Sequence, residues 1–486
     1  MKPSTGRASG LIIAFLFFSY YIMAQRPQLY AYQDLSKFSF AKQDDSLKKN
    51  WVCPELYKEK ATQKKYKEIW DGRTDFITSA IEANNYINDG EIYNYINQII
   101  IDLTKGNPSL IKQKQLLLID RSASVNAYAV GGNVIAVNLG LITFSQSREE
   151  VALVVAHELS HNILNHPENS MKEMAVWLTS EEYKNSLNAV LDSKYERLTK
   201  LKKVVEGYTF SRNKHHRYHE SEADSLAIVL LRNSNISFDP KAFLRLDSTD
   251  NEYKEPLKNE TKTYFASYNT TIEDWWFSKR TKGLSSKNYN FKDTTKLNDS
   301  LKTHPDCIER YNKTKNLVNI KGAFTPVTAS IKEKANKMLL WNMYDNMDLT
   351  ACLYRIFLEK DKGNADTWYD FMAHNVLAGL NYSNKQLNRF NAIGIRPKEY
   401  ISKNYYELQT MLEQIPADNL EQLYKSSANQ SFWGSMSAES KGLKALMSTL
   451  NFDTDDNDKK KASAAKEFIS SNPTSMYCEF ADHFKK

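Results

Sequence analysis

The stretch from Val151 to His166, VALVVAHELSHNILNH, sets two histidines and a glutamate inside an apolar run. His157 and His161 are four residues apart, so a helix presents both imidazoles on one face, where they can reach a single metal ion. Glu158 lies one position further around the helix, where a carboxylate can take a proton from a metal-bound water. The alternative is a core helix with satisfied polar groups, and this motif alone does not decide between the two.

A second segment supplies the group that a catalytic metal site still needs, since such zinc sites have three protein ligands and one open position. In HHRYHESEADSLAIVLL, Glu220 and Asp224 are again four residues apart, and the apolar residues from Leu226 indicate a buried helix that begins near His215. We expect Glu220 to be the third ligand and Asp224 to accept a hydrogen bond from a ligand imidazole. Two carboxylates on a buried face favour a bound cation.

The residues around these motifs predict helices and a small sheet. Apolar residues recur at helical spacing between 58 and 103, with a turn near 88–90. LLLID, starting at Leu116, predicts a buried strand, and AYAV and NVIAV predict two strands joined by Gly131–Gly132. Charged, helical sequence runs from 167 to 214.

The second half of the chain differs in composition. Residues 250–303 are rich in Asn, Lys, Thr and Ser and predict a long irregular excursion. We interpret its aromatic cluster at 275–277 as an anchor for the loop rather than as the lining of a substrate cleft. A composition shift at 322–326 indicates a domain boundary. Beyond it, residues 327–486 predict an all-helical region, in which LTACLYRIFLEKDKGNADTWYDFMAHNVLAGL resembles a tetratricopeptide-type helical hairpin.

The N-terminus has the layout of a secretory signal peptide. Lys2 and Arg7 precede an apolar run from Leu11 to Met23, and Ala24 is a small residue at the expected cleavage point. This run is shorter than the roughly 20 residues that a membrane span needs, so an uncleaved anchor is the less favoured alternative.

Charge and cysteine usage argue against two other classes of protein. The formal net charge of +7, spread over 486 residues, does not indicate nucleic-acid binding. The four cysteines are far apart and show no C-x-x-C spacing, which argues against a cysteine zinc site. Whether they pair or stay free is left open.

HELSH followed by ESEAD resembles the zinc metallopeptidases that include the CAAX prenyl endopeptidases, the heat-shock protease HtpX and the mitochondrial protease Oma. VNAYAVGGNVIAVNLGLI resembles the Asn-Ala strand and Gly-Gly turn of that family. His166 matches a histidine that often follows the metal helix, although its usual arginine neighbour is Asn165 here. THPDCIER, from Thr303 to Arg310, resembles the segment that closes the domain. The resemblance covers about residues 58 to 322, with these elements in the family's order.

The resemblance implies the following ligands for one zinc ion per chain: His157, His161 and Glu220. It also implies that Glu158 is the general base and that Asp224 supports a ligand. Arg217 matches an arginine common in the family, and with His219 it is a candidate for positioning the substrate or stabilising the oxyanion. We expect residues 126–130, which start at Asn126, to form an edge strand that binds the substrate backbone as an added strand.

The predicted fold is mainly α with a small β-sheet (α+β). A zincin-like metallopeptidase domain is followed by an all-helical, tetratricopeptide-like C-terminal domain. The predicted divisions of the chain are a signal peptide at 1–24, an N-terminal extension at 25–57, the metallopeptidase domain at 58–322 and the helical domain at 323–486.

The interval between the two motifs is charged, whereas membrane members of the family have hydrophobic spans there, so we do not expect prenylated or intramembrane substrates. The exported, tetratricopeptide-linked branch, which acts in bacterial periplasmic quality control, is the better analogy. We therefore predict an exported zinc metalloendopeptidase, periplasmic or extracellular, which activates a zinc-bound water through Glu158 and hydrolyses exported or misfolded proteins. Its C-terminal helices are expected to mediate peripheral association with membrane or outer-membrane proteins.

Two alternatives remain at this point. One is a periplasmic chaperone or scaffold that retains the zinc fold and acts mainly through its C-terminal helical domain. The other is a structural surface protein that binds no metal.

Overall fold

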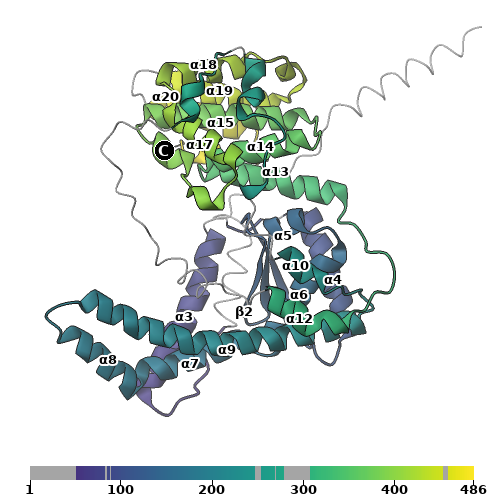
Figure 1. The fold of residues 1–486 in the computed structure, drawn as a ribbon, viewed down its shortest axis with the longest axis vertical. Coiled ribbons are helices and arrows are strands. Elements are labelled where there is room, and N and C mark those ends of the chain that lie inside the picture. Colours follow the sequence, from purple (N-terminus) through teal and green to yellow (C-terminus); the bar gives the residue numbers. More distant parts are fainter. Residues whose placement is uncertain are drawn as a thin grey trace, which may run out of the picture. The chain divides into compact units, whose positions relative to one another are not determined.

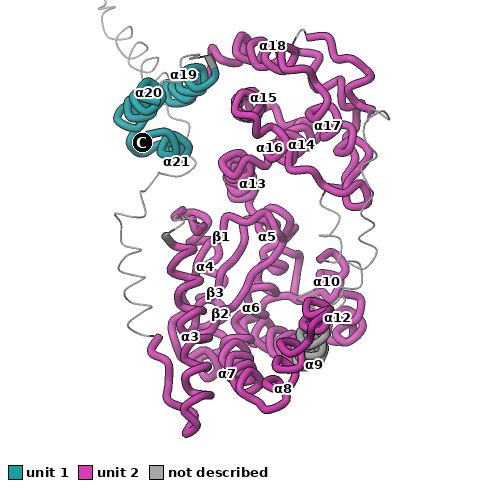
Figure 2. The backbone as a smooth tube through the Cα atoms, turned by 90° about the vertical axis from the view of Figure 1, so that its left-hand side faces the viewer, with its two compact units in different colours: residues 1–33, 437–486 teal, residues 34–436 magenta. Residues whose placement is uncertain are grey.

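The computed structural model describes residues 51–82, 85–87, 89–246, 253–268, 270–278, 307–452 and 458–485 (Figure 1). The expected signal peptide, most of the N-terminal extension and the Thr-His-Pro part of THPDCIER lie outside the described residues. The chain forms two compact units, and the larger is Asp34–Met436, whereas the smaller contains Ser437–Lys486 (Figure 2). The expected boundary at 323 is a different division of the chain and stays a prediction.

The larger unit contains the predicted sheet. Its three strands are β1 (Leu116–Asp120), β2 (Ala127–Gly131) and β3 (Val134–Asn138), in the order β1-β3-β2. β1 runs parallel to β3 and β2 runs antiparallel to it. All residues of β3 are buried, as its position in the centre of the sheet requires, and β2 lies at an edge. The three predicted strands and the edge position of the second are therefore confirmed.

The turn between β2 and β3 depends on residues that tolerate a left-handed backbone. Gly132 has φ of 58° and Asn133 has φ of 63°, and positive φ at both central residues is what a two-residue hairpin of this kind needs. A Cβ at Gly132 would overlap the indole nitrogen of Trp51, which packs over the turn. This turn therefore sets the connection between β2 and its antiparallel partner β3.

Helices surround the sheet in the larger unit. Asp89 caps the helix that begins at Gly90, because its carboxylate accepts hydrogen bonds from the backbone N–H groups of Glu91 and Ile92 at 3.1 and 3.0 Å. The helical character predicted between 58 and 103 is confirmed, and the structure divides it into two helices. The helices of this part are α3 (Lys60–Glu82), α4 (Gly90–Gly106), α5 (Leu139–Phe144), α6 (Arg148–Ile163), α7 (His166–Thr179), α8 (Glu181–Leu191), α9 (Arg197–Asn233), α10 (Lys241–Leu246) and α12 (Cys307–Thr314).

The start of α9 differs from the sequence-based prediction. The sequence predicts a helix from near His215, but α9 already begins at Arg197. No proline interrupts the sequence between 197 and 233, and one glycine, Gly207, costs only about 1 kcal/mol in a helix. The charged interval is therefore continuous with the helix that carries the second motif.

The C-terminal part of the described chain is helical, as predicted. The expected helical hairpin is formed by α14 and α15, which pack against each other. The helices of this part are α13 (Ala329–Asp345), α14 (Leu349–Asp361), α15 (Thr367–Lys385), α16 (Arg389–Ile393), α17 (Lys403–Gln414) and α18 (Ala417–Ala428), and in the smaller unit α19 (Ala438–Phe452), α20 (Asp458–Ser471) and α21 (Cys478–Asp482).

The described part of the irregular excursion packs on these C-terminal helices. The 3-10 helices η2 (Thr261–Tyr268) and η3 (Asp274–Phe277) contact α17, and Trp276 is 1% exposed. The Tyr264 ring stacks on Phe357 of α14, with ring centroids 4.5 Å apart. Trp276 of the aromatic cluster is thus buried, as an anchor would be, whereas Trp275 is 39% exposed.

The segment that follows the expected boundary pairs with the start of α6. Backbone hydrogen bonds join Arg148 N–H to the Thr325 carbonyl at 2.8 Å and Val327 N–H to the Gln146 carbonyl at 3.2 Å. Immediately afterwards α13 packs on α5. Within the part of the chain that the structure describes, no disulfide joins any of the four cysteines. Among the described residues, none of the helices has the length and apolar character that crossing a membrane requires.

We predict that Gly132→Ala destabilises the protein. The left-handed backbone alone costs a residue with a Cβ about 1–2 kcal/mol, and the overlap with Trp51 adds to this cost. Gly72→Ala in α3 is the matched control, because a Cβ there meets nothing within 4 Å and alanine favours a helix. Urea denaturation should show a lower unfolding free energy for Gly132→Ala and an equal or higher one for Gly72→Ala.

Candidate metal centre

The helix α6 carries the first motif and has a strong N-terminal start. The hydroxyl of Ser147 accepts a hydrogen bond from the Glu150 N–H at 3.2 Å, and Glu149 and Glu150 lie in the first turn, where negative charge suits the helix dipole. The helix packs against α9 and β2, and most of its residues are buried. Burial agrees with either a core helix or a metal site, so the arrangement of the polar side chains must distinguish them.

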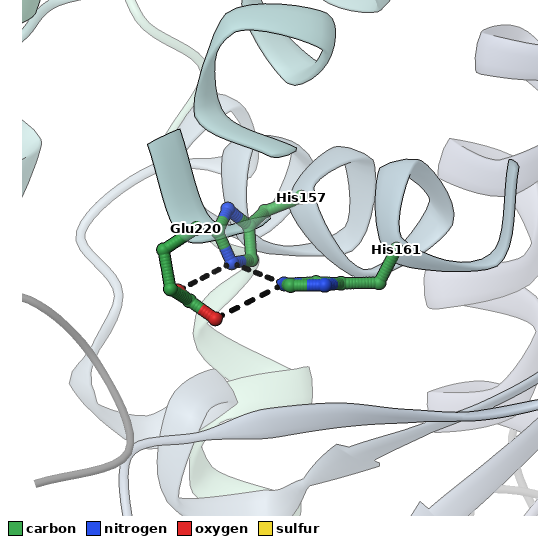
Figure 3. A group of neighbouring side chains, drawn as sticks. All are labelled: His157, His161 and Glu220. Carbon is green, nitrogen blue, oxygen red and sulfur yellow. Dashed lines mark hydrogen bonds and ion pairs between the residues drawn. The ribbon is translucent and has the colours of Figure 1, made fainter. Parts of the chain in front are cut away.

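Three side chains from α6 and α9 converge on one point (Figure 3). The Nε2 atoms of His157 and His161 are 3.0 Å apart. The carboxylate of Glu220 lies 3.2 Å from His157 Nε2 through Oε2 and 3.3 Å from His161 Nε2 through Oε1. The three side chains are 4%, 13% and 2% exposed, so the cluster is buried. The sequence motifs predict one site from these residues, and the structure brings them together.

The geometry of these donors fits a zinc ion. Ligand atoms at about 2.0–2.1 Å from a tetrahedral zinc lie about 3.3 Å from one another, close to the separations of 3.0, 3.2 and 3.3 Å seen here. Two imidazoles and one carboxylate are also a donor set used by catalytic zinc sites that keep a fourth position open.

The electrostatics of the cluster also favour a cation. Burial lowers the pKa of His157, but hydrogen bonds to Asp224 and Glu220 outweigh burial and raise it to about 10. A proton on this imidazole compensates the excess negative charge of the two buried carboxylates. A metal cation would compensate the same charge.

Asp224 lies behind His157, on the side away from the other donors. Its Oδ1 is 2.9 Å from His157 Nδ1, which is the contact expected from the sequence. Arg310 of α12 closes the arrangement, with Nη2 2.5 Å from Asp224 Oδ1 and Nε 2.9 Å from Oδ2, and its guanidinium lies 4.4 Å from the ring centre of Phe243. Burial raises the pKa of Asp224, and the charge of Arg310 and the hydrogen bond from His157 outweigh it and lower the pKa to about 2.

Sequence reasoning assigns no site role to Arg310. It identifies Thr303–Arg310 only as a segment that resembles the end of the family's domain. The guanidinium and Asp224 are 86 residues apart in the chain, so no local spacing links them. The one available signal is the arginine at the end of THPDCIER.

His161 has a different partner, His166, at the start of α7. Their Nδ1 atoms are 2.9 Å apart, and His166 Nε2 lies 3.4 Å from Glu222 Oε2. The His166 ring stacks on His219, with centroids 4.2 Å apart and an interplanar angle of 12°. Burial and the charges of His161 and His219 lower the pKa of His166 to about 3.

The sequence predicts four further site residues. Glu158 is 4% exposed on α6, next to His157. Asn126 precedes the edge strand β2, and its carbonyl accepts a hydrogen bond from Asn138 N–H at 3.1 Å. His219 lies in the ring stack with His166, and the side chain of Arg217 lies outside the described part of α9. The roles assigned to these four residues stay predictions.

Comparison with known proteins gives a family match that spans these residues. The profile of Peptidase family M48 matches residues 93–318, a span that contains the sheet, both motif helices and Arg310. Beta-barrel assembly-enhancing proteases from Escherichia coli (strain K12) and Shigella flexneri are each 23% identical to this chain over 342 residues, which is 65% of this chain and 65% of each relative. A Vibrio cholerae protein that carries this name in provisional form is 27% identical over 164 residues, 33% of this chain and 34% of its own length. The chain thus spans less than two thirds of the length of these relatives.

We predict that Arg310→Met destabilises the protein strongly, because it leaves the Asp224 carboxylate buried without its charge partner. Breaking a buried pair in this way costs about 3–5 kcal/mol. Lys313→Met on the same helix is the matched control, because its pair with Glu309 is about half exposed and such pairs contribute about 0–1 kcal/mol. Urea denaturation measures both, and equal losses for the two variants would contradict the assigned role of Arg310.

Proposed function

The chain carries a domain of peptidase family M48, and on this premise we propose that it is a zinc-dependent metalloendopeptidase. The observation that carries the proposal is the convergence of His157, His161 and Glu220 between two buried helices. This donor set matches the His₂Glu ligands of zinc peptidases, and a domain that used α6 only as a core helix would have no need of it.

Zinc, when bound by these residues, would act as a Lewis acid toward the scissile carbonyl and lower the pKa of a water beside it. Glu158 follows His157 on α6, and its carboxylate takes a proton from the attacking water as the new C–O bond forms. It then passes this proton to the nitrogen of the leaving amine as the C–N bond breaks. Asp224, paired with Arg310, holds His157 in the tautomer that presents Nε2 to the metal.

The substrate is proposed to bind along β2. This strand is at the edge of the sheet and adjoins α6, so a peptide added to its outer edge would run past the proposed metal ligands. Main-chain hydrogen bonds along an edge strand depend little on the substrate's sequence, which suits a peptidase that acts on unfolded segments. His219 and Arg217 remain the candidates for stabilising the oxyanion.

The proposed substrates are exported or misfolded proteins. Two lines support this: the signal-peptide layout of residues 1–24, and relatives named beta-barrel assembly-enhancing proteases. On this basis we place the protein outside the cytoplasm, in a periplasmic or extracellular quality-control role, and we assign contacts with membrane or outer-membrane proteins to its C-terminal helices.

We predict that wild-type protein contains one zinc ion per chain and cleaves casein, whereas Glu158→Gln binds zinc equally and cleaves at least about 100-fold more slowly, because it lacks the base. Metal analysis and a fluorescent casein assay measure both properties. Glu173→Gln on α7 is the control, since Glu173 is an exposed carboxylate outside the site, and it should cleave like wild type.

Three outcomes would change the conclusion. Cleavage by Glu158→Gln at the wild-type rate would show that the proposed mechanism is wrong. Wild-type protein without zinc would contradict the metalloendopeptidase and favour a structural protein. Zinc binding without cleavage, together with suppression of protein aggregation by wild type and Glu158→Gln alike, would favour the chaperone or scaffold.

A further inference from the structure

The two histidines of the metal site have outer partners of different chemistry. His157 Nδ1 faces the carboxylate of Asp224 at 2.9 Å, and that carboxylate is paired with Arg310. His161 Nδ1 faces an imidazole nitrogen, Nδ1 of His166, also at 2.9 Å. The first partner is therefore a charged pair, whereas the second is a ring that can either donate or accept a hydrogen bond.

The surroundings of His161 set the direction of its hydrogen bond. Its Nε2 faces Glu220 and His157, the side where a metal would bind, so the ring proton of the neutral imidazole belongs on Nδ1. His161 then donates to His166 Nδ1. The acceptor must in turn carry its own proton on Nε2, which lies 3.4 Å from Glu222 Oε2. The three side chains thus form a relay from α6 through the start of α7 to α9.

Local structure holds His166 in the orientation that this relay needs. Asn165, just before α7, has φ of 55°, and this left-handed residue turns the chain sharply between α6 and α7. The His166 side chain is 6% exposed and lies flat against the His219 ring of α9, so its ring plane is fixed by packing. A turn and a ring stack therefore fix the position of His166 Nδ1.

We propose that His166 is a positioning residue for the metal ligand His161: it accepts the Nδ1–H hydrogen bond of His161 and so holds Nε2 toward the metal. Glu222 orients His166 in the same relay. The proposal rests on the proposed zinc site and adds a specific hydrogen-bond acceptor to it. It also assigns a chemical role to the third histidine of HELSHNILNH.

The test compares two substitutions at position 166. His166→Phe keeps a flat ring that can stack on His219 but removes the acceptor, whereas His166→Asn places a carbonyl oxygen near the position of Nδ1 and keeps the acceptor. We expect zinc affinity, measured by competition with a chromogenic chelator, to fall about 10–100-fold in His166→Phe, and to stay within about threefold of wild type in His166→Asn. Glu173→Gln on the same helix is the control, since Glu173 is exposed and outside the relay, and its zinc affinity should be unchanged.

Each outcome separates this proposal from the zinc site itself. If wild type binds zinc and His166→Phe binds it equally, the positioning role is wrong while the proposed function stands. If Phe and Asn weaken binding to the same extent, position 166 matters through packing, and the proposal is again overturned. If wild type binds no zinc, the proposed function fails first.

A second variant keeps the test decisive if His166→Phe does not fold. Glu222 is 38% exposed, so Glu222→Ala removes the far end of the relay without disturbing buried packing. We expect it to weaken zinc binding several-fold, and a wild-type affinity in this variant would overturn the proposal. Circular dichroism of the metal-free variants confirms that each comparison is made on folded protein.

Discussion

Ionisable side chains that would normally be hydrated lie buried between α6 and α9, and the rest of the site depends on how their charges are balanced. Glu220 and Asp224 bring two negative charges into a region where they are 2% and 7% exposed. Arg310 supplies one positive charge, so with neutral imidazoles the arrangement would retain a net negative charge, which either a proton on His157 or a bound cation can balance. An uncompensated buried charge is costly, and a bound cation removes that cost. A cation bound by the proposed ligands would therefore also stabilise the fold.

This requirement explains why distant parts of the chain meet at one place. Arg310 follows the irregular excursion, yet α12 must pack on α10 to bring its guanidinium between Asp224 and Phe243. On the opposite side of the metal ligands, the turn before α7 returns His166 to His161. Each ligand imidazole therefore has a partner from an element other than its own helix. Side chains held by packing in this way present their metal-facing nitrogens without loss of rotamer freedom on binding.

The start of α6 is tied to the C-terminal helices as well. The strand-like pairing of 325–327 with 146–148 and the packing of α13 on α5 fix the helix that carries both histidines. The described excursion segments, η2 and η3, pack on the same C-terminal helices through Trp276 and Tyr264. Within the larger unit, the helical region is thus joined to the region that matches Peptidase family M48 at the end of α6 that precedes the candidate ligands.

Local patterns in the sequence are sufficient to predict the candidate ligand set and most of the helices and strands. Residues four apart on a helix share a face whatever the helix packs against, so helical spacing alone groups His157 with His161, and Glu220 with Asp224. The strands of the sheet could also be predicted locally, since alternation of apolar and polar residues, apolar runs and a Gly-Gly turn are all local signals. The predicted start of α9 is wrong, because a charged helix without an apolar face gives no clear boundary in the sequence. In the structure this charged part continues into the buried half of the helix, so α9 starts at Arg197.

Contacts across long chain separations were decided by tertiary structure alone. The pairing of Arg310 with Asp224 spans 86 residues, and nothing in either local sequence specifies which arginine balances the carboxylate. The stack of His219 on His166 could not be predicted either, because it depends on how α7 lies against α9. The sequence by itself determined which side chains could bind a metal, since helical periodicity is a property of the backbone. Only the tertiary structure decided what orients and neutralises those side chains, because burial and charge balance depend on which helices pack together.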